Sequence, residues 1–185
     1  MPSSALARSA TAKRRAIMSA DQIDRAISRM AHQIVEPEDM QGGILLIGIR
    51  SGGENLTRRL GQKIGEITGK QPHIGFLNIN LYRDDDVARE LPESEIRDEI
   101  TGKTVVIVDD VLYTGRTIRS ALDAVTDLGR PSAIRLAVLI DRGLRELPIQ
   151  GDFVGRFVPT SRREHVDVIL ASAFSQSDEV ALLSD

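Results

Sequence analysis

The sequence predicts an α/β fold with a mostly parallel central sheet that is flanked by helices on both faces. Short, continuous apolar runs alternate along the chain with longer segments whose apolar residues recur at helical spacing. The runs at residues 44–49, 105–108 and 134–140 are typical of strands that are buried on both faces of a parallel sheet. In such sheets, ligands bind at the carboxyl ends of the strands.

The first predicted helix begins at Ser19, because Ser19 and Gln22 have the spacing of a capping box. Its core face is defined by Ile23, Ile27, Met30, Ala31 and Ile34. The strand at 44–49 leads into a second helix that ends near Gly69 and carries Leu56, Leu60, Ile64 and Ile67 on its apolar face. Partial alternation of apolar residues predicts a further strand over residues 74–82.

Residues 83–100 are charged, contain Pro92 and have weak periodicity, so we expect them to form a mobile arm. The strand at 105–108 follows a turn at Gly102, and the next helix ends at Gly129. A strand at 134–140, a charged loop at 141–152 and a last strand at 166–171 complete the prediction. We expect residues 1–18 to be a flexible tail and residues 19–185 to form a single domain.

The composition excludes several classes of function. With 185 residues, the chain is long enough for one α/β domain with a full core, but too short for two sizeable ones. It has no cysteine, which excludes disulfides and thiol nucleophiles and suits a cytoplasmic protein. Since no apolar run approaches the ~20 residues that span a bilayer, we expect no membrane partner. The net charge of −3 means that nucleic acid could be bound only by a local basic face.

The most informative segment is the end of the strand at 105–108. Asp109 and Asp110 follow this strand, and Thr-Gly-Arg-Thr occupies positions 114–117. Two adjacent carboxylates at such a place are costly to bury without a cation or hydrogen-bond donors. The small-residue loop and the helix after it can bind a phosphate through backbone N–H groups. The pattern therefore predicts a site for a phosphorylated ribose; the alternative is a strand end and a helix cap without a ligand.

A second glycine-containing turn, Arg50-Ser51-Gly52-Gly53, joins a strand to a helix, and we expect a second anion site there. The alternative is a tight turn with no ligand. Because Ser51, Asp109 and Arg142 each follow a predicted strand, we expect these residues to converge at one edge of the sheet.

The stretch Val-Asp-Asp-Val-Leu-Tyr-Thr-Gly-Arg-Thr at 108–117 resembles the diphosphoribosyl-binding signature of the type I phosphoribosyltransferases. Together with Asp-Arg-Gly at 141–143 and Arg-Glu-Leu-Pro at 145–148, it is similar to one branch of that family. This branch contains the bifunctional pyrimidine operon regulators that are also uracil phosphoribosyltransferases. The resemblance covers residues 23–168 and implies the type I phosphoribosyltransferase fold, with a small hood or flexible arm.

The resemblance implies a role for each candidate residue. Asp109 and Asp110 would be catalytic and would hold Mg²⁺, the implied cofactor, through water. Phosphoribosyl diphosphate would be bound by two loops and the arm, at Ser51, Gly52, Arg83, Val111, Leu112, Tyr113, Thr114, Gly115, Arg116 and Thr117. The base would be contacted at Arg142 and Val166.

The implied reaction is attack of uracil N1 on the anomeric carbon of phosphoribosyl diphosphate, which releases diphosphate and forms UMP. The acid pair would stabilise the positive charge that builds on the ribose. The chain departs from the family at Ser51-Gly52-Gly53, where Thr-Arg-Gly is usual, so the arginine that can pair with diphosphate is absent at position 52. A transferase for a purine or for orotate would keep the same fold and acid pair, but the match at 145–148 argues against it.

The resemblance also implies a regulator that binds the leader of pyrimidine (pyr) mRNA in response to UMP or UTP. The residues that match the RNA-binding face of the family are Ser28, Arg29, His32, Arg145 and Arg156, and we expect them to lie outside the substrate pocket. Leu144 and Gln150 stand where the family commonly has His and Arg, so the alternative is a plain uracil phosphoribosyltransferase. The family forms dimers and higher oligomers, and we expect a homo-oligomer.

Overall fold

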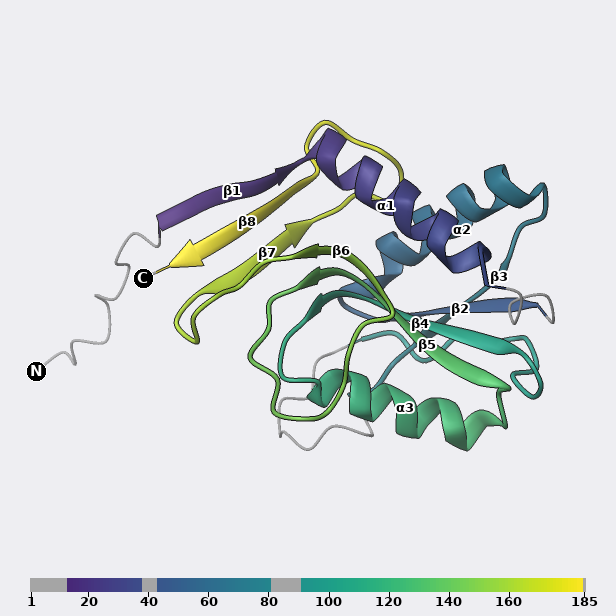
Figure 1. Cartoon of the computed structure of the whole chain (residues 1–185). Helices are drawn as coiled ribbons and strands as arrows, with labels where there is room; N and C mark the ends of the chain where they lie inside the picture. The colour runs from purple at the N-terminus through teal and green to yellow at the C-terminus, as the bar shows by residue number, and fades with distance from the viewer. Residues whose placement is uncertain (1–12, 38–42, 81–90, 185) are drawn as a thin grey trace, which may run out of the picture.

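The computed structural model describes residues 13–37, 43–80 and 91–184 (Figure 1). Its elements are, in chain order, β1 (Lys13–Ser19), α1 (Ala20–Val35), β2 (Ile44–Ile49), α2 (Gly53–Thr68), β3 (His73–Leu77), β4 (Thr104–Leu112), α3 (Arg116–Leu128), β5 (Ala133–Asp141), β6 (Phe153–Phe157), β7 (His165–Ile169) and β8 (Glu179–Ser184). None of the helices in these ranges is long and apolar enough to cross a membrane.

The core of the molecule is a parallel sheet of five strands in the order β3-β2-β4-β5-β6. The strand β4 lies in the middle, where Ile107 pairs with Ile47 of β2 and with Leu136 of β5. The four residues 105–108 are fully buried, as the continuous apolar run predicts. The predicted fold class is therefore confirmed.

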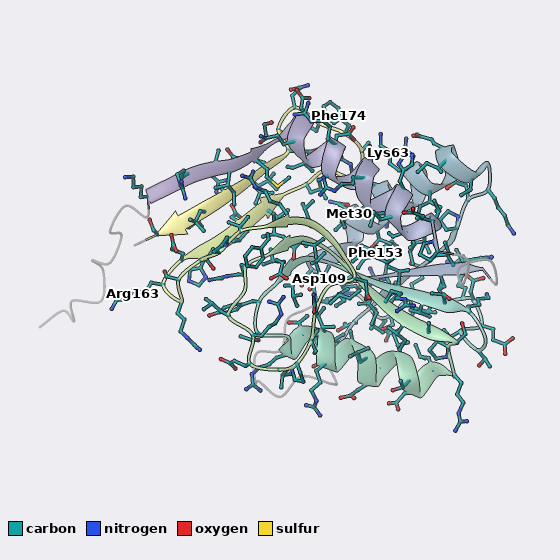
Figure 2. The ribbon with its side chains drawn as sticks, in the orientation of Figure 1. Met30, Lys63, Asp109, Phe153, Arg163 and Phe174 are labelled. Atoms are coloured by element: carbon teal, nitrogen blue, oxygen red, sulfur yellow. The ribbon has the colours of Figure 1, made fainter. Side chains whose placement is uncertain are left out.

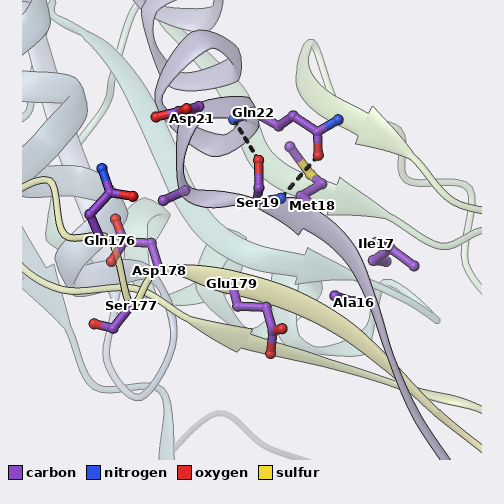
Figure 3. Close-up of a pocket in the computed structure, with 11 residues that line it drawn as sticks. Ala16, Ile17, Met18, Ser19, Asp21, Gln22, Gln176, Ser177, Asp178 and Glu179 are labelled. Atoms are coloured by element: carbon purple, nitrogen blue, oxygen red, sulfur yellow. Dashed lines mark hydrogen bonds between the residues drawn. The ribbon is translucent and has the colours of Figure 1, made fainter.

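Helices cover both faces of this sheet: α1 and α2 lie on one side and α3 on the other (Figure 1). The predicted apolar face of α1 is buried in the hydrophobic cluster that α1 and α2 form with one face of the sheet, which we call the first core cluster. The predicted capping box at its start is also confirmed, because Ser19 N–H donates to Gln22 Oε1 (2.9 Å) and Gln22 N–H donates to Ser19 Oγ (3.4 Å) (Figure 3). A Cβ on Gly53 would lie 2.1 Å from the carbonyl oxygen of Val108. Glycine is thus required where α2 meets β4.

A second, small sheet of three antiparallel strands, β1-β8-β7, joins the two ends of the chain (Figure 1). It corrects the expectation that residues 1–18 form a flexible tail: residues 13–18 belong to β1, and residues 1–12 lie outside the described ranges. The strands β1, β6 and β8 are absent from the prediction. The strand β1 could not be predicted because its partner strand is distant in sequence. Arg14, for example, donates a hydrogen bond to Glu179, 165 residues later.

The segment expected to be a mobile arm is only partly described, since residues 81–90 are outside the described ranges. The part that is described is held against β3: Phe76 and Glu95 exchange two backbone hydrogen bonds (2.9 and 2.7 Å). Asn78 donates to the carbonyl of Leu91 (3.2 Å). Residues 91–95 are therefore tied to the core sheet. The strand predicted over residues 74–82 ends earlier, at Leu77. The next residue, Asn78, makes the hydrogen bond to Leu91.

A buried ion pair attaches the loop before β8 to the helices. The carboxylate of Asp178 accepts hydrogen bonds from Arg59 and from the N–H groups of Ala171 (3.0 Å) and Ser175 (3.3 Å). Arg59 also donates to Asp24 of α1 (3.0 Å). Because the side chains of Arg59 and Asp178 are only 3% and 1% exposed, neither charge has water as a substitute partner.

Asp178→Ala should lower the free energy of unfolding by about 3–5 kcal/mol, because Arg59 would keep a buried charge without its main partner. Urea denaturation followed by circular dichroism measures this change. Asp21→Ala removes an exposed carboxylate at the start of α1 and serves as the matched control. Equal losses in the two variants would contradict the role given to the ion pair.

Candidate active site

The acid pair lies at the carboxyl end of β4, the central strand (Figure 2, label Asp109). Asp109 is buried at 6% exposure, and its Oδ1 accepts a hydrogen bond from the backbone N–H of Asp110 (3.0 Å). This position follows from the sequence pattern, since the apolar run ends where the acids begin. The two carboxylates thus share one end of the core sheet.

Burial raises the pKa of both carboxyls, and it raises the pKa of Asp109 well above the ordinary range. The charge of Asp110 raises the pKa of Asp109 further, and the charge of Asp167 on β7 acts in the same direction on Asp110. Two such groups favour a ligand that brings hydroxyl donors or positive charge. The site is therefore suited to a diol or a cation.

The loop between β4 and α3 leads through a glycine into the N-terminus of a helix. Gly115 has a φ of 93°, and α3 begins at the next residue, Arg116. A Cβ on Gly115 would lie 3.4 Å from Ile149, so that both backbone strain and packing favour glycine. The helix N-terminus and the N–H groups before it can bind an anion. We call residues 113–117 the phosphate loop.

The second predicted loop lies against the acid pair. Ser51 has a φ of 81°, in the left-handed region that side chains rarely adopt, and Gly52 follows it. A Cβ on Gly52 would lie 2.6 Å from Asp110 Oδ1 and 3.0 Å from Asp109 Oδ1. A larger residue there would force the carboxylates to move. Glycine at position 52 therefore lets this backbone lie close to the acids.

Arg50 does not replace the arginine that is missing at position 52. Its side chain is buried and donates to Glu54 (2.5 Å) and to the carbonyl of Glu93 (2.9 Å). It also lies 5.5 Å from the ring of Phe76. These contacts commit Arg50 to holding the second loop, α2 and the segment at 91–95 together.

Two cavities lie beside the acid pair, and Ser51 and Gly52 line both of them. The first, of ≈ 270 Å³, is lined by Ile49, Arg50, Ser51, Gly52, Ile79, Asn80, Leu91, Asp109, Asp110, Val111 and Thr117. The second, of ≈ 170 Å³, is lined by Ser51, Gly52, Glu54, Asn55, Asp110, Val168 and Leu170. The structure thus brings Ser51, Gly52 and the acid pair together, as expected from their places at strand ends. Arg83 lies outside the described residues.

The two residues predicted to bind the base have different surroundings. The guanidinium of Arg142 is buried, donates to Thr160 Oγ1 (2.8 Å) and the carbonyl of Glu164 (2.6 Å), and lies 4.0 Å from the Tyr113 ring. Its side chain therefore braces the surrounding loops. Val166 belongs to β7 and packs against the first core cluster, two residues before Val168 of the second cavity.

The residues predicted to bind RNA divide into two groups. Arg29 on α1 and Arg156 on β6 line one cavity of ≈ 450 Å³ together with Arg25; Ser28 and His32 are on the same helix, α1. Arg145 is not part of this group, because its guanidinium donates to the carbonyl of Tyr113 in the phosphate loop (2.9 Å). Arg145 does not line the cavities at the acid pair, but it contacts the phosphate loop from outside them.

Three polar residues near these sites are absent from the prediction. Asn80 and Asn55 line the cavities at the acid pair, and Asn55 Nδ2 also donates to the carbonyl of Leu170 (2.7 Å). No spacing in the sequence distinguishes them. Arg25 lies in the basic cavity, and its spacing of four residues from Arg29 on one helix was a usable signal.

The acid pair lies with two glycine-containing strand-to-helix loops at the carboxyl ends of a parallel sheet. This arrangement fits the active site of a phosphoribosyltransferase. Residues 16–172 match the family described as "Phosphoribosyl transferase domain", and the chain belongs to this family. It is similar to proteins named "Bifunctional protein PyrR". That of Chloroflexus aurantiacus is 51% identical over 171 residues, covering 90% of this chain and 93% of the relative. That of Thermoanaerobacter sp. is 52% identical over 158 residues, covering 83% and 89%.

A solved structure supports the fold. The hypoxanthine phosphoribosyltransferase of Staphylococcus aureus has a TM-score of 0.64 to this chain at 18% identity, covering 80% of this chain and 79% of that one. At this identity the similarity concerns the architecture alone. The predicted family is confirmed by the relatives and by the matched domain.

Asp110→Asn should raise the free energy of unfolding by about 1–3 kcal/mol at neutral pH, because it removes a partly buried ionisable carboxyl beside Asp109. The raised pKa values mean that the folded protein holds these protons more tightly than the unfolded chain. Wild-type stability therefore falls as the pH rises through the folded-state pKa values, and the advantage of the variant grows over the same interval. Denaturant titrations between about pH 4 and pH 8 measure this difference. A constant difference across the interval would contradict it.

Proposed function

We propose that this protein is a uracil phosphoribosyltransferase that forms UMP from uracil and phosphoribosyl diphosphate, and that it also regulates pyrimidine genes by binding their leader RNA. The observation that carries the proposal is the position of the acid pair between two glycine-containing loops whose backbone N–H groups can bind anions. It occurs in a chain that is about half identical to proteins named bifunctional and PyrR. We further propose that the chain acts in the cytoplasm as a single-domain homo-oligomer.

The phosphate loop binds the 5′-phosphate of the substrate through backbone N–H groups and the N-terminus of α3. With the phosphate held there, the ribose hydroxyls lie at Asp109 and Asp110, whose carboxylates accept hydrogen bonds from them. During transfer, positive charge develops at the anomeric carbon, and the carboxylates stabilise it electrostatically. The protein residues need only position the substrates and stabilise the charge that develops on the ribose, because uracil N1 is itself the nucleophile.

The diphosphate of the substrate lies at the second loop. The N–H groups around Ser51 and Gly52, with the N-terminus of α2 behind them, are its binding groups. Since Arg50 is committed elsewhere and position 52 is glycine, this loop contributes backbone donors and no side-chain cation. Diphosphate binding here depends on backbone geometry more than on charge.

The chemistry of this donor set fits Mg²⁺. Two carboxylates with raised pKa values are hard oxygen ligands, and no cationic side chain of the described residues donates a hydrogen bond to them. Mg²⁺ keeps several waters and binds few protein carboxylates together with substrate phosphates, so Asp109 and Asp110 would hold it through water. When bound, Mg²⁺ neutralises the charge of the leaving diphosphate.

The RNA-binding surface is the basic cavity between α1 and β6. Arg25, Arg29 and Arg156 are all exposed there, while backbone carbonyls fix two of them: Arg29 donates to Gly155, and Arg156 donates to Ile17 (2.6 Å). Arginines held in this way can bind phosphates with little loss of side-chain freedom. We infer that this cavity, and not Arg145, contacts the leader RNA.

Wild-type protein should form UMP from uracil, phosphoribosyl diphosphate and Mg²⁺, and Asp110→Asn should lower turnover by roughly two orders of magnitude through loss of one electrostatic stabiliser. Radiolabelled uracil and a stopped-time assay measure both values. Asp21→Asn, at an exposed position of α1, is the control and should retain full turnover. Wild-type turnover in a folded Asp110→Asn variant would remove the acid pair from the mechanism. Absence of UMP formation by wild-type protein would refute the proposed activity.

Replacing Arg29 and Arg156 together with Gln should weaken binding to pyr leader RNA. The slope of log K against log salt concentration should become shallower by up to about two units, because two phosphate contacts are lost. Gel shifts over a salt series, with UMP saturating, measure this slope. Neither arginine lines the cavities at the acid pair, so UMP synthesis reports on folding. If wild-type protein does not prefer leader RNA to random RNA, the regulatory half of the proposal fails.

A further inference from the structure

The guanidinium of Arg145 is fully engaged in one loop junction. Nε donates to the carbonyl of Ile149 (2.8 Å), and Nη1 donates to the carbonyls of Tyr113 (2.9 Å) and Gly143 (3.2 Å). Nη2 donates to the carboxylate of Asp141. One side chain thereby connects the end of β5, the loop that follows it and the phosphate loop.

The residues after Arg145 extend this contact along the phosphate loop. The backbone N–H groups of Glu146 and Leu147 both donate to the carbonyl of Thr114, at 2.9 and 3.2 Å. The carboxylate of Glu146 accepts a hydrogen bond from Arg116 Nε at 2.9 Å. Residues 145–149 therefore form a continuous brace along the phosphate loop. The sequence motif at 145–148, which has no role in the reaction as described, supplies this brace.

These contacts determine which way the peptide groups of the phosphate loop point. In a planar trans peptide, the C=O and the N–H lie on opposite sides. The carbonyls of Tyr113 and Thr114 both point to the brace, so the N–H groups in the same peptides, those of Thr114 and Gly115, point to the other side. This is the arrangement that a backbone anion site requires.

We propose that Arg145 is a positioning residue for the 5′-phosphate: it holds the carbonyl of Tyr113 outward and so fixes the N–H of Thr114 toward the ligand. The inference rests on the proposed function, because it takes the phosphate loop as the site of the phosphoribosyl group. It assigns Arg145 to substrate binding, although the residue matches the RNA-binding face of the family.

The test compares Arg145→Gln and Arg145→Lys with wild type in two measurements. The first is KM for phosphoribosyl diphosphate against KM for uracil, and the second is the Kd of UMP by calorimetry. Arg145→Gln should raise both phosphate-dependent constants by about tenfold, the usual effect of losing a charged hydrogen bond, and leave KM for uracil near wild type. Arg145→Lys should give an intermediate value, since one ammonium cannot reach all four acceptors.

Arg163→Gln, on an exposed residue between Thr160 and β7, is the matched control and should leave every constant unchanged (Figure 2, label Arg163). A wild-type KM for phosphoribosyl diphosphate in folded Arg145→Gln overturns the proposal, and a loss confined to leader-RNA binding assigns Arg145 to the RNA face instead. If the Gln variant does not fold, the Lys variant decides by the same criterion. Lack of uracil-dependent activity in wild type refutes the proposed function separately, because the Kd of UMP, measured by calorimetry, still tests the brace.

Discussion

The side-by-side placement of two carboxylates at the end of β4, one buried and one partly buried, is the constraint on which the site depends. Neither acid has a cationic side chain as a hydrogen-bond partner among the contacts of the described residues, and burial opposes the ionised form of each. Two glycines let the neighbouring backbone approach the acid pair closely. Gly53 lets α2 pack on β4, and Gly52 lets the second loop lie against the acids. The small sheet adds β7 from the other side, with Val168 in the same cavity as Asp110.

This constraint also connects ligand binding to stability. Burial opposes the ionisation of both carboxyls in the folded state, and a ligand that supplies hydroxyl donors or positive charge relieves this penalty. Binding to the folded state alone then raises the free energy of unfolding by mass action. Occupancy of such a site changes the stability of the whole domain and not only of one loop.

The sequence was sufficient for the elements whose signals are local. The buried runs of β2, β4 and β5, the capping box at Ser19 and the family all follow from residues close together in the chain. The strands β1 and β8 could not be predicted in this way, since each is defined by its partner at the opposite end of the sequence. The position of Arg145 shows the same limit: similarity assigned it to an RNA face, whereas its contacts with Tyr113 and Asp141 depend on how two loops fold together.

The pairing of β1 with β8 has a consequence for synthesis on the ribosome. The core sheet is complete once Phe157 has emerged, and its helices can pack as they appear, as domains do when they fold from the N-terminus onward. The small sheet cannot form until residues 179–184 leave the exit tunnel, so β1 must wait for its partner until after the core sheet has been synthesised. The strand β7, whose Val168 lines the cavity at Asp110, pairs with β8, so this wall of the cavity is completed after the core sheet.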